Sequence, residues 1–127
     1  MLKEMQRLIY PNELAPLSSV PFHKDVPCIE RFFPQGFPLH MAIHRVSDAQ
    51  PDGEKYTQAH THDVDEINIL IGDEGGLKYE IQLGDERFEV ESNTSIYIPA
   101  GTPHAANVLS GSGYFVVLRL PQKGENL

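Results

Sequence analysis

Short runs of alternating apolar and polar residues, separated by proline and glycine, constrain the fold of this chain more than any other feature. Leu39, Met41 and Ile43 alternate with polar or small residues, and the same period recurs in residues 67–71 and 79–83. Residues two apart on a β-strand point to the same face, so each run predicts a strand with one buried side. Ten prolines and ten glycines in 127 residues favour many short strands joined by turns over a helical bundle.

The turns between these runs can also be predicted. Residues 47–54 and 72–76 have the composition of loops, Gly84-Asp85 that of a tight hairpin turn, and residues 92–94 that of a further turn. The last run, residues 114–120, is apolar on both faces, as expected for a strand buried between layers. About six to eight antiparallel strands with regularly spaced turns predict an all-β sandwich or a single small β-barrel.

Residues 1–38 differ from the rest of the chain. Apolar residues at helical spacing predict a short N-terminal helix that ends before Pro11. Residues 11–38 contain six prolines and predict an irregular arm, with short edge strands at most. Because this arm is too apolar for a solvated tail, we expect it to pack on a barrel of residues 39–127 or on the second subunit of a homodimer.

Charge and composition exclude several classes of partner. The formal net charge is −8 and basic residues do not cluster, whereas nucleic-acid binding needs a basic patch, so we expect no nucleic-acid partner. No apolar run approaches the roughly 20 residues of a membrane helix, and none resembles a secretory signal, so we expect a cytoplasmic protein without membrane contact. The one cysteine, Cys28, cannot form an intramolecular disulfide and is expected to be a small buried hydrophobe.

Three of the six histidines lie in two short clusters with a carboxylate. His60 and His62 are two residues apart, so on a strand both imidazoles face the same side. On a straight strand Glu66 would lie roughly 20 Å from His60, too far to share one ion. A shared ion therefore requires the chain to turn at residues 63–65, which are suitable turn material, with Glu66 beginning the next strand.

The third histidine, His104, follows the rigid sequence Pro99-Ala100-Gly101-Thr102-Pro103, which can aim its side chain back into a barrel. A lone His-x-His pair usually means ordinary surface or core histidines. Its coincidence with a carboxylate and a third histidine favours a site for one divalent metal ion. Three neutral imidazoles and one carboxylate suit Fe, Mn, Ni, Co or Zn better than Mg or Ca. On an octahedral ion this set leaves two open positions, the condition for catalysis rather than for a closed structural site.

These clusters resemble the two motifs of the cupin superfamily, G-x5-H-x-H-x3,4-E-x6-G and G-x5-P-x-G-x2-H-x3-N. The core of the first motif is met at residues 60–66, and the core of the second by Pro99, Gly101 and His104. The resemblance implies a double-stranded β-helix, or jelly-roll, barrel. It also implies the metal ligands, which are His60, His62, Glu66 and His104.

The outer motif positions depart from the family pattern without touching a ligand. Glu54 stands where the first glycine is expected, and Gly72 comes one residue early. Asn93 replaces the opening glycine of the second motif, and asparagine tolerates the same left-handed backbone. Asn107 also comes one residue early, which leaves its role open.

The resemblance leaves the reaction open, because cupins include both enzymes and binding domains. Our first hypothesis is a metal-dependent enzyme, an oxygenase, isomerase or lyase, that acts on a small oxygen-rich metabolite such as a carboxylate, an enolate or a sugar-like compound. The alternative is a non-catalytic cupin that binds or senses a small molecule. A third hypothesis, a purely structural domain, is disfavoured by the complete ligand set.

A titratable group beside the open metal positions would favour catalysis, and a purely apolar lining would favour binding. The general acid and base are not assigned. The candidates for a general base are His44, Tyr79, Glu80 and Tyr97. The candidates to anchor a substrate anion are Arg45, Lys78 and Arg119. Asp63 and Asp65 are the candidates to form hydrogen bonds with the ligands.

Overall fold

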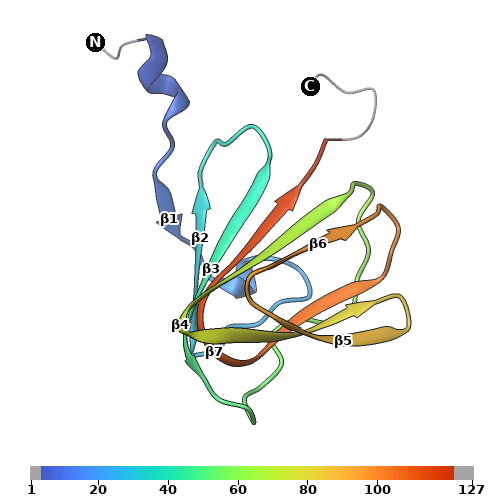
Figure 1. Ribbon diagram of the computed structural model, residues 1–127. Coiled ribbons are helices and arrows are strands. Elements are labelled where there is room, and N and C mark those ends of the chain that lie inside the picture. The colour runs from blue at the N-terminus through green and yellow to red at the C-terminus, as the bar shows by residue number, and fades with distance from the viewer. Residues whose placement is uncertain (1–3, 122–127) are drawn as a thin grey trace.

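The computed structural model describes residues 4–121, which form an antiparallel β-barrel with two short 3-10 helices (Figure 1). The elements in chain order are η1 (Glu4–Leu8), β1 (Asn12–Leu14), η2 (Leu17–Ser19), β2 (Ile29–Pro34), β3 (His40–Ala49), β4 (Glu66–Leu83), β5 (Glu86–Glu91), β6 (Thr94–Ile98) and β7 (His104–Arg119). No helix in this part of the chain has the length and apolar character needed to cross a membrane.

Two long strands, β4 and β7, organise the barrel. The strand order is β1-β2-β3-β7-β4-β5, and β6 pairs with the first part of β4. Residues 66–72 of β4 pair with residues 113–119 of β7, and residues 77–83 pair with residues 104–111. Each long strand therefore serves two parts of one rolled sheet, and the result is the jelly-roll barrel implied by the motifs (Figure 1).

The loop predicted at residues 72–76 is wrong, because β4 runs through this segment with a shift in its pairing to β7. Glycines allow the two strands to approach closely at this bend. A Cβ added at Gly111 or Gly113 would lie 2.2 Å from a backbone oxygen of β4, and both residues have positive φ angles, +100° and +147°. Glycine clusters usually mark turns, but here they permit a strand to bend.

The other turn predictions have mixed outcomes. The hairpin at Gly84-Asp85 is confirmed between β4 and β5, with Gly84 at a φ of +61°. The turn at residues 92–94 is confirmed, although Thr94 already begins β6. The loop predicted at residues 47–54 is wrong in its first part, because β3 continues to Ala49 and pairs there with Gly111.

The N-terminal segment is partly ordered into the sheet. The predicted short helix is confirmed as η1, which ends before Pro11, while residues 1–3 lie outside the described part. Beyond it, β2 pairs with β3, and Leu17 and Ile29 are buried in the core. The chain from η1 to β1 extends away from the barrel (Figure 1).

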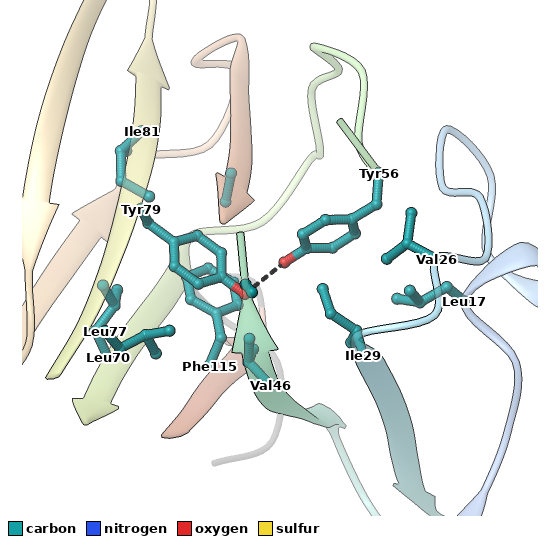
Figure 2. Close-up of a cluster of buried hydrophobic side chains, with 12 residues drawn as sticks. Leu17, Val26, Ile29, Val46, Tyr56, Leu70, Leu77, Tyr79, Ile81 and Phe115 are labelled. Atoms are coloured by element: carbon teal, nitrogen blue, oxygen red, sulfur yellow. Dashed lines mark hydrogen bonds between the residues drawn. The ribbon is translucent and has the colours of Figure 1, made fainter. Parts of the chain in front are cut away.

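The apolar core is a cluster of buried side chains in one part of the barrel interior (Figure 2). It combines residues of β2, β3, β4 and β7 with Tyr56, whose hydroxyl lies 2.8 Å from the hydroxyl of Tyr79. Cys28 is half-buried against this core, and burial raises the pKa of its thiol, which disfavours a role as nucleophile.

Candidate metal centre

The two histidine clusters are brought together by backbone hydrogen bonds. The N–H of His60 donates to the carbonyl of His104 at 3.1 Å, and the N–H of His104 donates to the carbonyl of His60 at 2.9 Å. The chain then bends at residues 63–64, and β4 begins at Glu66. The turn that a shared ion requires between His62 and Glu66 is therefore present.

The four predicted ligand side chains converge. The imidazoles of His60, His62 and His104 place ligand nitrogens within 4.8 Å of one another. The Glu66 carboxylate lies between two of these rings, with Oε1 at 3.4 Å from His62 Nε2 and Oε2 at 3.5 Å from His104 Nε2. Within residues 4–121, both of these buried Nε2 atoms lack a hydrogen-bond partner. Unsatisfied buried nitrogens facing a carboxylate fit a divalent metal ion at this position.

Hydrogen bonds fix the orientation of these side chains. Nδ1 of His60 lies 2.6 Å from the carbonyl of Gln58, and Nδ1 of His104 lies 2.9 Å from the carbonyl of Thr102. A carbonyl only accepts, so each Nδ1 carries the proton and each Nε2 keeps its lone pair for a metal. The side-chain amide of Asn68 donates to Glu66 Oε2 at 2.9 Å and holds the carboxylate in place.

The charge states at neutral pH suit metal binding for most of the set. Burial, assisted by the charge of Arg119, lowers the pKa of His62 to about 4, and burial also lowers the pKa of His60. Burial acts to raise the pKa of Glu66, but the contact with His104 and the hydrogen bond from Asn68 prevail and hold it at about 2. Burial opposes protonation of His104 as well, yet the Glu66 contact raises its pKa. A cation bound at Nε2 would compete with protonation of this ring.

A small cavity adjoins three of the four side chains, those of His60, Glu66 and His104. Its walls include polar groups as well as Phe115 and Val117. The other polar residues that line the cavity are His23, His44, Tyr56, Thr57, Asn68 and Arg119. The lining of the cavity is therefore not purely apolar, as it would be in a site for passive binding.

Of the four residues considered as a general base, only His44 lines this cavity. It is buried, which lowers its pKa to about 3, and Nδ1 lies 3.3 Å from the Tyr56 hydroxyl. Tyr79 is buried in the core, and Tyr97 is exposed. Glu80 forms ion pairs with Lys55 and Arg87 away from the cavity.

Only some of the candidate anion anchors and candidate partners of the ligands lie near the cavity or the ligand segments. Arg119 lines the cavity, whereas Arg45 is exposed and Lys78 pairs with Glu91. Asp65 accepts hydrogen bonds from the N–H of Ala100 and from the Tyr97 hydroxyl. It thereby ties the turn before β4 to the loop that precedes His104.

Asn107, whose role the sequence left open, fastens the segment that leads to His60. Its Oδ1 accepts hydrogen bonds from the N–H groups of Tyr56 at 2.8 Å and Thr57 at 2.9 Å. Its Nδ2 donates to the carbonyl of Thr57 at 3.2 Å. The asparagine of the second cupin motif was the sequence signal that could have indicated a role for Asn107. Sequence reasoning also missed Asn68, which lies two residues after Glu66 on the same strand face.

Comparisons with known proteins show one local sequence likeness and a broad likeness of fold. No family model matches the chain. An acireductone dioxygenase of Klebsiella pneumoniae is 42% identical over 53 residues, which cover 40% of this chain and 28% of the relative. The chain therefore matches less than a third of the length of this relative.

Two solved structures cover most of the chain at low sequence identity. A predicted oxalate decarboxylase from Thermotoga maritima superposes with a TM-score of 0.61 at 10% identity, over 89% of this chain and 94% of the other. KdgF from a Halomonas species superposes with a TM-score of 0.56 at 18% identity, over 87% and 94%. Together with the jelly-roll topology, these likenesses show that the chain has the fold of cupins, and its two motifs resemble those of the cupin superfamily.

Proposed function

We propose that this cupin is a metal-dependent enzyme that acts on a small oxygen-rich metabolite. The ion would be held by His60, His62, Glu66 and His104. The observation that carries the proposal is the convergence of three imidazoles and a carboxylate, with two buried Nε2 atoms that have no other partner within the described residues. The donor set suits Fe, Mn, Ni, Co or Zn.

When bound, such an ion supplies Lewis-acid activation of a substrate oxygen or, if it is iron, a site for oxygen chemistry. The residues of the chain have separate tasks around it. Asn68 orients the Glu66 carboxylate, and Asn107 fixes the segment that carries His60. His44 lines the cavity and is the candidate that we assign to exchange a proton with a substrate.

The reaction class we favour is oxygenation, supported by the local likeness to an acireductone dioxygenase. An acireductone is accordingly the first substrate to test. The protein is purified without an affinity tag, stripped of metal, and loaded separately with Fe, Mn, Ni, Co or Zn. Acireductone loss is then followed with and without oxygen, and oxygen uptake is measured in the aerobic samples.

We expect at least one metal form to consume acireductone, and His62→Ala to reduce turnover to background. Arg45→Gln, which alters an exposed arginine on β3, is the matched control and should retain full activity. Oxygen uptake without acireductone loss would contradict the substrate. Saturable binding with no turnover in any metal form would replace the enzyme by the alternative, a cupin that binds or senses a small molecule.

We also propose that the protein forms a homodimer. Met5, Leu8, Ile9 and Leu14 are exposed on the segment that extends from the barrel, and β1 is a three-residue edge strand. Exposed apolar side chains beside an unpaired edge favour association with a second copy. Light scattering that reports only a monomer at micromolar concentration would contradict this. A cytoplasmic location and the lack of a nucleic-acid partner stay predictions, which cell fractionation and a DNA- and RNA-binding assay can check.

A further inference from the structure

Strand register places Arg119 beside the candidate ligand Glu66, and it places Arg31 on the same face of the sheet, beside the cavity residue His44. His40 of β3 pairs with Arg119 of β7, and Arg119 pairs with Glu66 of β4, so these three residues form one row across the sheet. Four residues away along β3, His44 lies between Arg31 of β2 and Phe115 of β7 in a parallel row. Residues an even number apart on a strand share a face, so both rows lie on the same side of the sheet as Glu66.

Arg119 is the first of these arginines, and it lines the cavity beside Glu66. Its Nε is buried and lacks a hydrogen-bond partner within residues 4–121. The nearest carboxylate oxygen, Glu66 Oε1, lies at 3.5 Å, which is an ion pair but not a well-formed hydrogen bond. If Glu66 binds a metal, its negative charge is shared with that metal, and the Nε–H of Arg119 is available to donate to another anion.

Arg31 is the second, and it is more deeply buried, with only 6% of its surface exposed. Its guanidinium carbon lies 5.1 Å from the centre of the Phe33 ring. Within residues 4–121 its side chain has no hydrogen bond or ion pair. Buried arginines are almost always paired, so a buried guanidinium that has only an aromatic ring against it is open to an anion.

The two guanidinium groups also affect each other. Burial, followed by the charge of Arg119, lowers the pKa of Arg31, and burial lowers the pKa of Arg119. This part of the barrel therefore holds two mutually repelling cations beside one carboxylate, and a divalent metal would add further positive charge. The chain as a whole carries a net charge of −8, so this interior region contrasts with the rest of the molecule. A ligand with negative charge would relieve the repulsion.

We propose that Arg119 and Arg31 form an anion subsite that holds a carboxylate or phosphate group of the substrate next to the metal. This inference rests on the proposed function for the identity of the site and adds the charge of the substrate. The planar fork of a guanidinium matches the oxygens of both anions. A substrate held in this way by its anionic end would present its remaining oxygens to the ligand cluster.

The test measures binding of two probes, oxalate and inorganic phosphate, to metal-free wild-type protein by calorimetry. Arg119→Gln and Arg31→Gln remove one guanidinium each, and Arg45→Gln removes an exposed guanidinium from β3 as the matched control. We expect the dissociation constant of the preferred probe to rise at least about tenfold in each of the first two variants, as for the loss of a charged hydrogen bond. The control should stay within about twofold of the wild type.

Preference between the probes identifies the chemistry. Tighter oxalate binding assigns a carboxylate substrate, and tighter phosphate binding assigns a phosphorylated one. Equal affinity of wild type and both glutamine variants for the probes would overturn the subsite, as would failure of the wild type to bind either probe. If a glutamine variant does not fold, the Nε–H resonances of Arg31 and Arg119 in the wild type decide instead, because they must shift on addition of the probe.

Metal content separates this inference from the proposed function. Neither arginine is a candidate ligand, so Arg31→Gln should keep the metal content of the wild type. Arginine-dependent oxalate or phosphate binding by a protein that takes up no metal would leave the subsite in place and remove the metal-dependent enzyme. A wild type that binds metal but has no affinity for either anion would remove the anion subsite and leave the metal-dependent enzyme in place.

Discussion

The two ends of the barrel interior differ in chemistry although the same strands build both. In β3, Val46 belongs to the apolar core and His44 to the cavity, and in β4, Leu70 belongs to the core and Glu66 to the cavity. The apolar end stabilises the fold by removing carbon surface from water. The polar end buries imidazoles, a carboxylate and guanidinium groups, which opposes folding unless they are paired. The apolar end therefore stabilises the barrel, and the polar end contains the candidate metal centre.

The largest predicted change in the free energy of unfolding comes from a substitution at the apolar end. Leu70 has no exposed surface, so Leu70→Ala should lower the free energy of unfolding by about 2 to 5 kcal/mol, through lost burial and the cavity left behind. Urea denaturation measures this loss, and metal content measured on the folded protein should not change. Ile71→Ala, at the next and exposed position, is the control and should cost less than about 0.5 kcal/mol. Loss of metal in Leu70→Ala at a temperature where it is folded would contradict the separation of the two ends.

Asn107 joins the two regions, and its removal should affect both. Asn107→Ala leaves the buried N–H groups of Tyr56 and Thr57 without their acceptor, which should cost about 2 to 3 kcal/mol of stability. Because the same segment leads to His60, metal affinity should also fall, by about tenfold. Denaturation and metal titration check the two effects, with Asn12→Ala on the exposed edge strand as the control. A variant that loses stability but keeps full metal affinity would mean that Asn107 does not position the ligands.

The polar end should make stability depend on pH through His44. Burial lowers the folded-state pKa of His44 to about 3, well below its ordinary value of 6.5, so the folded protein keeps this ring neutral while the unfolded chain binds a proton below pH 6.5. Stability is therefore lost as the pH falls from 6.5 towards 3, by up to about 1.4 kcal/mol per pH unit. His44→Gln should flatten this slope in urea denaturation of metal-free protein between pH 7 and pH 5. An unchanged slope would show that His44 is not held neutral.

The smallest effect should come from the hydroxyl pair that borders both regions. Tyr79→Phe removes the contact to the Tyr56 hydroxyl at 2.8 Å and should cost about 0.5 to 1.5 kcal/mol. The double variant Tyr56→Phe/Tyr79→Phe should cost less than the sum of the two single variants, because it leaves no hydroxyl of the pair unpartnered. Strict additivity in a thermal-denaturation cycle would indicate that the two hydroxyls do not interact.

Local spacing was enough to predict the turn between His62 and Glu66, whereas the resemblance to the cupin motifs implied that His104 joins them. The His-x-His spacing and the reach of a metal–ligand bond together required a bend before Glu66, and β4 begins there. The alternation of apolar residues likewise predicted the strands on either side of the Gly84 hairpin. The turn and these strands depend on neighbours in sequence, so the sequence alone contains the information.

Features that depend on distant contacts were not predictable in this way. The glycines of residues 72–76 have turn composition, yet pairing with β7 keeps the chain extended and the bend depends on Gly111 and Gly113. Arg31 lies in a proline-rich segment interpreted as an irregular arm, and only its pairing with β3 shows that it enters the barrel. Asn107 could not be assigned because its partners, Tyr56 and Thr57, lie about fifty residues away along the chain.

The most direct test of the account is the metal content of untagged protein, measured by elemental analysis. Wild type is compared with His62→Ala/His104→Ala and with His40→Ala, which removes a histidine outside the ligand cluster. We predict one equivalent of Fe, Mn, Ni, Co or Zn in the wild type and in His40→Ala, and less than about a tenth of an equivalent in the double variant. A wild type that holds no metal after reloading, or a double variant that keeps a full equivalent, would contradict the metal centre.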